Sequence, residues 1–492
     1  MPDKEGLTPL IGGDIWGLIT SGMYDNPLAV YREYIQNAAD ALSTGGNGSI
    51  GRVRIKIDTS SSSVSISDNG PGLSKEAAVR ALLPVARSQK RQGTDRGFRG
   101  IGRLSGLAFA DTVSFLTRTR RGDPVTRVVW DGTKLRNRVR HHCENDRVIH
   151  ECVKIETLAG SDYPANFFEV KVCGVGRHAA SRILNRVAVR DYIADVCPVP
   201  ISPEFPYASR VITLFEQNTS PLTLDILLDD EESSITRRYG DTIRLSKDRE
   251  DTFADFEEIC IPSADGNGIA AIGWIGHSSY LGAIPKETGI RGVRARVGNI
   301  QVGDESAFEH LFPEERFNRW CVGEIHVLDS RIVPNGRRDY FEPGPHIRNL
   351  ENHLGAVFRR TAARCRKAST TRNNNRKLLS ALRQLEETYE LAGTGYLAPG
   401  DAIVLVGKAL DRIPDIREYM SAMNGRLEVT EDELDKIANK LKNFQPRQCH
   451  SEFGGISESE IPIYRKLFHA LTNVSQSHNT AKEVIEAVLN QS

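Results

Sequence analysis

Residues 33–41 read Glu-Tyr-Ile-Gln-Asn-Ala-Ala-Asp-Ala, and this stretch decides how the rest of the chain is interpreted. An Asn-Pro pair at residues 26–27 precedes it, a typical helix start that combines a side-chain cap with a residue lacking an N–H. At about 100° per residue, apolar positions fall on one face of this helix: Leu28, Tyr31, Ile35, Ala38 and Leu42. Glu33, Asn37 and Asp40 fall together on the opposite face. For an isolated helix the ordinary interpretation is a solvated polar face, and two glycine-rich elements downstream argue against it.

The first glycine-rich element follows a predicted β-hairpin over residues 53–66, in which apolar residues alternate with polar ones. The second strand runs into Asp68-Asn69-Gly70-Pro71-Gly72-Leu73 and places a carboxylate at its own end. Gly70 and Gly72 permit positive φ and have no Cβ, so a flat ring can lie against the backbone there. Asp68 can then accept a hydrogen bond from an exocyclic amine of that ring.

The second glycine-rich element reads Gly97-Phe98-Arg99-Gly100-Ile101-Gly102 and precedes an apolar segment, residues 104–109, which we expect to be helical. Backbone N–H groups of a glycine loop at the start of a helix can bind phosphate. The element follows no strand of a dinucleotide-binding fold and lacks the Gly-Lys-Ser/Thr of a P-loop. It therefore predicts a phosphate site of another kind.

In this order and spacing, the helix and the two glycine-rich elements resemble the GHKL ATPases, the superfamily of DNA gyrase B, the ninety-kilodalton heat-shock chaperones, histidine kinases and the MutL proteins. The heat-shock-protein-90-like ATP-binding proteins resemble the chain most. The resemblance implies an α+β fold: a Bergerat-fold α/β sandwich, an α/β middle (transducer) domain and a helical C-terminal domain. We place these domains at residues 1–183, 184–345 and 346–492. The resemblance also implies ATP and Mg²⁺ as cofactors and a slow ATP hydrolase as the activity.

The resemblance further implies a role for each motif residue. Glu33 is the expected general base that activates water, and Asn37 is the expected protein ligand of Mg²⁺, a cation that prefers oxygen ligands. Asp68 is expected to read adenine, with Asp40 supporting that side of the pocket. Further nucleotide contacts are expected from the glycine-rich elements and from a lid over residues 73–96, namely from Gly70, Gly72, Ser88, Gly97, Gly100, Ile101 and Gly102.

One departure from the chaperone pattern concerns the adenine side of the pocket. The chaperones have a Gly-Thr pair at the start of a later strand, and its hydroxyl assists adenine binding. The matching strand here, residues 167–172, has phenylalanine where the threonine would be. Thr117 or Thr119 could compensate, and the sequence leaves that choice open.

Residues 332–339, Ile-Val-Pro-Asn-Gly-Arg-Arg-Asp, resemble the middle-domain loop of the heat-shock chaperones, whose arginine reaches the γ-phosphate. Alignment on Asn335 and Asp339 makes Arg338 that arginine, with Arg337 as a near alternative. A planar, permanently charged guanidinium suits charge that develops on a transferring phosphoryl group. The alternative interpretation is two surface arginines in a turn. Because the first motif begins at residue 33, a histidine kinase, whose ATPase domain follows a helical domain, is disfavoured.

Composition fits these expectations and limits them. The chain has 492 residues with 64 basic and 64 acidic side chains, so no net field attracts it to DNA or to an anionic membrane. It shows neither a leader peptide nor a membrane-length apolar run, so we expect a cytoplasmic protein without a membrane partner. Its eight cysteines form no Cys-x-x-Cys motif and are expected to be reduced. A zinc site at His142, Cys143, His150 and Cys152 is the less favoured alternative there, since the usual finger spacing is missing.

The segment 348–383 contains ten Lys or Arg and a single acid, Glu351. Such a run can bind the phosphates of nucleic acid, although a solvated helix face or an intramolecular partner is the favoured interpretation. Two functions therefore remain. The first is a chaperone-like ATPase that forms a homodimer through its N-terminal domains on ATP binding and remodels a protein client. The second is a MutL- or MORC-like clamp that closes on nucleic acid, and a simple ATP-binding switch is a third possibility.

Overall fold

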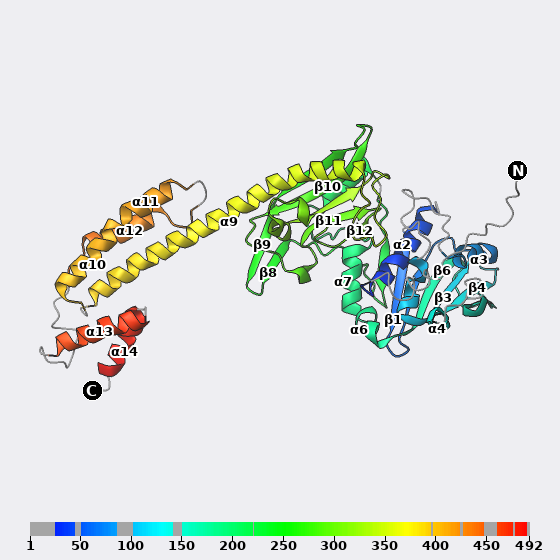
Figure 1. Cartoon of the computed structure of the whole chain (residues 1–492), viewed down its shortest axis with the longest axis horizontal. Coiled ribbons are helices and arrows are strands. Elements are labelled where there is room, and N and C mark those ends of the chain that lie inside the picture. The colour runs from blue at the N-terminus through cyan, green and yellow to red at the C-terminus, as the bar shows by residue number, and fades with distance from the viewer. Residues whose placement is uncertain are drawn as a thin grey trace. The chain divides into compact units, whose positions relative to one another are not determined.

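The computed structural model describes residues 25–44, 51–85, 102–140, 150–219, 221–394, 397–423, 427–446, 460–475 and 478–489. Its internal contacts divide the chain into two compact units, residues 1–365 and 366–492. The first unit holds two β-sheets with their covering helices, and the second is helical (Figure 1). The predicted α+β class is confirmed.

The first sheet has seven strands in the order β5-β4-β3-β6-β2-β1-β7. Neighbouring strands are antiparallel, except that β7 runs parallel to β1. The strands are β1 (Arg52–Asp58), β2 (Ser63–Asp68), β3 (Ala110–Arg118), β4 (Val125–Asp131), β5 (Val153–Leu158), β6 (Phe167–Val175) and β7 (Asp225–Leu228). The hairpin predicted over residues 53–66 is β1 and β2, so that prediction is confirmed.

Helices cover one face of the first sheet. They are α2 (Ala29–Thr44), α3 (Lys75–Leu82), the 3₁₀ helix η2 (Gly102–Ala108), α4 (Gly132–Arg140), α6 (Arg177–Ile183) and α7 (Arg186–Val196). Residues of β1 alternate between buried and exposed, as expected for a sheet with one covered face. Helix α2 confirms the first sequence prediction, and the Asn26 side chain caps it by accepting a hydrogen bond from Leu28 N (3.1 Å).

The segment expected as an apolar helix over residues 104–109 is η2, a 3₁₀ helix. Its Gly106 N–H donates to the hydroxyl of Tyr34 on α2 (3.1 Å). The Gly106 N–H thus bonds to a side chain of another helix, and this hydrogen bond joins η2 to α2. Short 3₁₀ segments are common where a connection is held by such outside contacts.

The core under the first sheet also receives residues from later in the chain. Val189 and Ile193 of α7, Ile226 of β7 and Ile235 are buried in it together with the α2 residues. The first core thus draws on both sides of residue 183, and the three domain boundaries remain a prediction.

The second sheet has six strands in the order β12-β11-β13-β10-β9-β8. The strands are β8 (Thr242–Ser246), β9 (Arg249–Pro262), β10 (Ile269–Ser278), β11 (Gly292–Val297), β12 (Ile300–Val302) and β13 (Val322–Val327). Strands β11 and β12 form an antiparallel pair. Helix α8 (Ala208–Asn218) packs on this sheet, over a core around Trp274. Short 3₁₀ helices lie at Lys286–Thr288, Glu309–Leu311 and Glu315–Trp320.

A buried ionic cluster joins the C-terminal end of α7 to the second sheet. Arg237 donates to the carbonyls of Ala194 (3.0 Å) and Cys197 (2.7 Å), and Arg296 donates to that of Asp195 (2.9 Å). Both arginines also contact Glu324 of β13, which has no exposed surface, at 3.4 and 2.7 Å. Burial alone would raise the pKa of Glu324, but the two arginines and His326 hold it well below its usual range.

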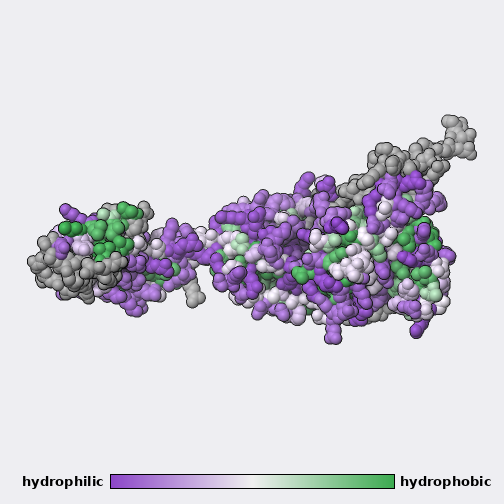
Figure 2. Space-filling model, turned by 90° about the horizontal axis from the view of Figure 1, so that it is seen from below, coloured by the Kyte–Doolittle hydropathy of each residue, from purple (hydrophilic) through white to green (hydrophobic). Residues whose placement is uncertain are grey.

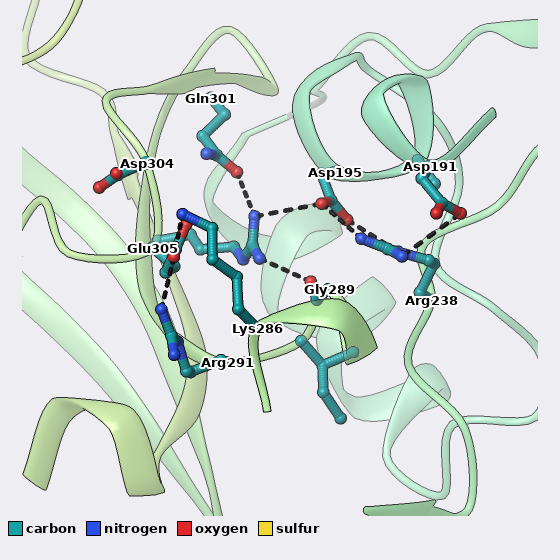
Figure 3. Close-up of polar contacts among 12 residues, drawn as sticks. Asp191, Asp195, Arg238, Lys286, Gly289, Arg291, Gln301, Asp304 and Glu305 are labelled. Atoms are coloured by element: carbon teal, nitrogen blue, oxygen red, sulfur yellow. Dashed lines mark hydrogen bonds and ion pairs between the residues drawn. The ribbon is translucent and has the colours of Figure 1, made fainter. Parts of the chain in front are cut away.

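A second set of charges surrounds this cluster. Figure 3 shows Arg238 reaching both Asp191 and Asp195, and the ion pair between Arg238 and Asp195 measures 2.6 Å. Arg294 of β11 lies 3.9 Å from the same Asp195 carboxylate. Lys286 and Arg291 bind Glu305 at 2.9 and 2.7 Å. Of these contacts, those of Asp191 and Asp195 link α7, which packs on α2, to Arg238 and to Arg294 of the second sheet.

Helix α9 (Pro345–Gly393) starts in the first unit and ends in the second. In the first unit Phe358 stacks on Phe312, with ring centroids 4.3 Å apart. The second unit adds α10 (Pro399–Asp411), α11 (Ile413–Ser421), α12 (Glu431–Lys442), α13 (Ile461–Ser475) and α14 (His478–Leu489). Thr430 and Glu433 form a reciprocal capping box at the start of α12.

The face shown in Figure 2 is largely hydrophilic, with hydrophobic residues gathered in patches on the helical unit. Large exposed apolar side chains of that unit include Ile403, Val404, Ile463, Val474 and Val488. None of the helices within the described ranges combines the length and apolarity needed to cross a membrane. The six cysteines in the described part of the chain are free thiols.

We expect Glu324→Ala to destabilise the first unit by about 3–5 kcal/mol, because it leaves two buried arginines without their carboxylate. The measurement is urea unfolding followed by tryptophan fluorescence, since Trp130 and Trp274 are buried in the two sheets. Glu258→Ala is the matched control, because Glu258 forms an exposed pair with Arg210 (2.6 Å) and should change stability by less than about 1 kcal/mol. Equal effects of the two substitutions would contradict a stabilising role for the cluster.

Candidate functional site

The polar face of α2 is enclosed by protein. Glu33 and Asp40 are only 9% and 8% exposed, and Gln36 between them is 1% exposed. Asn37 is half-buried on the same helix. Charged side chains rarely reach such burial on an ordinary surface helix, so the interpretation of a solvated polar face is excluded.

Glu33 lies against the end of the second glycine-rich element. Its Oε1 atom accepts hydrogen bonds from Arg32 Nε (3.2 Å) and Nη2 (3.1 Å). A Cβ atom added at Gly102 would collide with the Glu33 carboxylate. Only glycine fits at residue 102 in this arrangement, and the structure thus places Gly102, the last residue of the second glycine-rich element, beside the predicted base.

Asp68 ends β2 on the helix-covered face of the sheet, opposite the buried Val53 of β1. Its Oδ1 atom accepts a hydrogen bond from Gly70 N (2.9 Å), and within the described residues its Oδ2 atom accepts none. Burial raises the pKa of Asp68 to about 7, and the Gly70 hydrogen bond offsets only part of this rise. A ligand amine that donates a hydrogen bond to this carboxylate stabilises its charged form.

Two positions in the loop after Asp68, residues 70 and 72, have no room for a Cβ atom. A Cβ at Gly70 would lie 2.7 Å from Asp68 Oδ1. Gly72 has φ of 67°, in the left-handed region that glycine adopts at no steric cost, and a Cβ there would overlap the Arg118 carbonyl. Both positions thus require glycine because of close contacts within the protein, and only Gly72 has positive φ; the expected contact of these glycines with a nucleotide stays a prediction.

Strand β6, which has phenylalanine where the chaperones have threonine, lies between β3 and β2 in the sheet. Asp68, Phe168 and Thr117 are paired across β2, β6 and β3, so their side chains share one face. Thr117 accepts a hydrogen bond from Leu73 N (2.8 Å) and donates one to Phe167 O (2.9 Å). The other candidate, Thr119, bonds to Asp123 (3.0 Å) at the end of the strand. Of the two threonines, Thr117 contacts the loop that follows Asp68.

Arg338 reaches α2 from a turn that follows the second sheet. The Arg338 N–H donates to Asn335 O (3.0 Å), and the Arg338 carbonyl accepts from Gly303 N (2.8 Å). Arg338 itself has φ of 59°, a conformation that non-glycine residues adopt at some cost and mostly at functional or tightly constrained positions. Its guanidinium donates from Nη1 to the Gln36 side-chain oxygen. Arg337, by contrast, is exposed.

Two residues near this contact escaped the sequence reasoning. Gln36 lies between Glu33 and Asn37, and the only available signal was its position one helical turn after Glu33. Tyr192 of α7 is the other; burial raises its pKa above the usual range, against the nearby positive charge of Arg32. No local motif marks Tyr192, because only the packing of α7 on α2 brings it there.

Several predicted site residues lie outside the described residues: Ser88, Gly97, Gly100 and Ile101. The same holds for His142 and Cys143 of the zinc alternative. In the described part of the chain, no group of three or more His, Cys, Asp or Glu side chains could hold a metal ion. A Mg²⁺ bound through one amide and the oxygens of a nucleotide needs no such group.

Asp68 makes the unit less stable as the pH rises. Its folded pKa of about 7 lies above its ordinary value of 3.8, so its contribution to stability is complete below pH 3.8 and is lost as the pH rises through 7. Asp68→Asn stays neutral and can keep the Gly70 hydrogen bond. We therefore expect its free energy of unfolding, relative to wild type, to increase between pH 4 and pH 8 by up to about 4 kcal/mol.

Urea unfolding at several pH values tests this expectation. Asp162→Asn, at an exposed position of the same unit, is the control and should follow the wild type at every pH. A difference between Asp68→Asn and wild type that does not change with pH would contradict the buried carboxyl.

The comparisons with known proteins agree with this geometry. The sequence model of the family described as "Histidine kinase-, DNA gyrase B-, and HSP90-like ATPase" matches residues 26–154. Chaperone protein HtpG of Psychrobacter cryohalolentis is 30% identical over 143 residues, 24% of this chain and 21% of that protein. The Polaromonas naphthalenivorans HtpG is 32% identical over 142 residues, 24% of this chain and 22% of that protein. The HtpG of Acinetobacter baylyi is 32% identical over 130 residues, 22% of this chain and 20% of that protein.

The matched region spans about a fifth of the length of these curated relatives. It contains α2 and the Asp68 loop and reaches into β5. The fold, the motifs and these matches together place residues 26–154 of the chain in the GHKL superfamily, with heat-shock-protein-90-like proteins among their relatives.

Proposed function

We propose that the chain is a slow, Mg²⁺-dependent ATP hydrolase whose catalytic groups come from helix α2 and from the turn of Arg338 that follows the second sheet. One contact carries the proposal: Arg338 bonds to Gln36, 302 residues away in sequence and on the same helix as Glu33 and Asn37. A surface arginine in a turn would have no reason to be ordered against that helix. The contact places a fixed positive charge beside the helix expected to bind the phosphates.

Each residue has a chemical task in this proposal. Glu33 accepts the proton of the attacking water, and Arg32 holds its carboxylate at Oε1. Arg338 stabilises charge on the transferring phosphoryl group. The Asn37 side-chain oxygen is the protein ligand for Mg²⁺, which when bound neutralises phosphate charge and fixes the phosphates. Asp68 accepts from the adenine amine, and Gly102 lets the phosphate loop approach Glu33.

The wider function is proposed from the relatives. The matched curated proteins are named chaperones, which supports closure of the 73–96 segment on ATP, N-terminal dimerisation and remodelling of a protein client. Residues 86–96 of that segment lie outside the described residues.

The nucleic-acid alternative has less support. Two arginines of the basic run are engaged within the first unit, Arg360 with Glu257 (2.7 Å) and Arg364 with Asp255 (2.9 Å). These pairs favour the intramolecular interpretation of that part of the run. We therefore retain the chaperone-like ATPase as the single proposed function.

Glu33→Ala should bind ATP and lose about 10²- to 10⁴-fold in turnover, because it removes the general base but leaves the adenine contacts in place. Calorimetry measures binding, and a coupled phosphate-release assay measures turnover. Glu216→Ala is a control, since Glu216 is exposed on α8 and should leave both quantities unchanged. Hydrolysis at the wild-type rate by Glu33→Ala would remove Glu33 from the mechanism.

Arg338→Ala should keep the affinity for ADP and lower turnover of ATP by up to about 10³-fold, the range known for arginines inserted at a γ-phosphate. Arg337→Ala is the matched control, because that neighbour is exposed and should behave like the wild type. If Arg337→Ala is impaired and Arg338→Ala is not, the assignment is wrong by one residue. If neither is impaired, the second sheet supplies no catalytic group.

A further inference from the structure

The loop between β2 and α3 is held from both sides by polar contacts that no sequence motif indicated. This loop, residues 69–73, carries the two glycines that follow Asp68. At its start Asn69 Oδ1 accepts from Arg52 N (2.7 Å), and the Asn69 N–H donates to Arg52 O (3.2 Å). These two bonds fix the end of the β1–β2 hairpin.

The far side of the loop is held by strands β3 and β6. Asn166, the residue before β6, donates from Nδ2 to Gly70 O (2.8 Å). Thr117 of β3 accepts from Leu73 N (2.8 Å) and donates to Phe167 O (2.9 Å). Thr117 has no exposed surface, whereas Asn166 is exposed. Both ends of the Gly70–Leu73 segment are therefore bonded to side chains outside it.

The placement of Asp68 depends on this segment. Asp68 Oδ1 is held by the N–H of Gly70, and the carbonyl of the same Gly70 is held by Asn166. Asn166, Gly70 and the Asp68 carboxylate thus form one hydrogen-bonded series. A shift of Gly70 would turn the carboxylate away from its present direction. In the register of the sheet, the neighbour of Asp68 on β6 is the phenylalanine Phe168, which offers no polar group to a base.

We infer that Thr117 and Asn166 are positioning residues that fix the Gly70–Leu73 turn, so that Asp68 reads a 6-aminopurine by accepting from its amine. The inference rests on the proposed ATP site and names how that site selects its base. A 6-oxopurine presents an acceptor to the same carboxylate and leaves a buried polar pair unsatisfied, which strongly disfavours binding. The turn, rather than a hydroxyl on β6, thus sets the selectivity.

The test is the ratio of the dissociation constants of MgGTP and MgATP, measured by calorimetry or by competition on the full chain. We expect Asn166→Ala to reduce this ratio about five- to tenfold, the effect of one lost hydrogen bond of ordinary strength. Thr117→Val keeps the shape of the side chain and removes its hydroxyl, and should reduce the ratio at least as much. Thr117→Ser keeps the hydroxyl and should retain the wild-type ratio, as should Asp162→Ala on the loop that leads to Asn166.

The ratio separates positioning from plain stability. If Thr117 only supported the fold, Thr117→Val would lower the melting temperature and weaken both nucleotides equally, which would leave the ratio unchanged. Asn166 is exposed, so its substitution keeps the test valid even if Thr117→Val fails to fold. An unchanged ratio in Asn166→Ala, or in a folded Thr117→Val, overturns the inference.

Asp68→Asn distinguishes failure of this inference from failure of the proposed function. An amide can turn its oxygen toward a 6-amino group or its NH₂ toward a 6-oxo group, so the ratio should fall toward one in this variant. If it falls while Asn166→Ala and Thr117→Val keep the wild-type ratio, Asp68 reads the base without the turn contacts. If wild type and Asp68→Asn show the same ratio, Asp68 is not the base reader, and both this inference and that part of the proposed function are wrong.

Discussion

The buried polar face of α2 determines which polar contacts the rest of the first unit must supply. The carboxylates of Glu33 and Asp40 and the amides of Gln36 and Asn37 need polar partners in such a place. An unpaired buried charge costs several kcal/mol. Arg32 binds Glu33, Arg338 binds Gln36, and Gly102 leaves the space that the Glu33 carboxylate occupies. Burying this polar face costs more free energy than burying an apolar one would, and a role of the face in chemistry accounts for that cost.

The second sheet is joined to α2 through helix α7. Helix α7 packs on α2, and Arg237 and Arg296 bind its last carbonyls while they share Glu324 of β13. The turn of Arg338 is tied to Gly303 beside β12. The turn of Arg338 thus follows a sheet that is joined, through buried ionic contacts, to α7, which packs on α2. This joint explains how a residue so late in the chain can lie at α2.

The elements with strong local signals were predictable from the sequence. The α2 helix has an Asn-Pro start and a regular apolar face, the β1–β2 hairpin alternates cleanly, and the capping box at Thr430 has both of its partners. The 3₁₀ form of η2 was not predictable, because a tyrosine hydroxyl on another helix takes the Gly106 N–H. The roles of Gln36, Tyr192, Asn166 and Thr117 also depend on contacts between distant segments. Periodicity within one segment carries no information about such contacts.

The central claim is that α2 and Arg338 together form one ATP site, and a crystal structure with Mg²⁺ and a non-hydrolysable ATP analogue tests it most directly. The account predicts the γ-phosphate in contact with Arg338, the Mg²⁺ bound to the Asn37 side chain and the adenine amine on Asp68. An analogue bound elsewhere, or bound at α2 while Arg338 remains on Gln36 without touching phosphate, would contradict it.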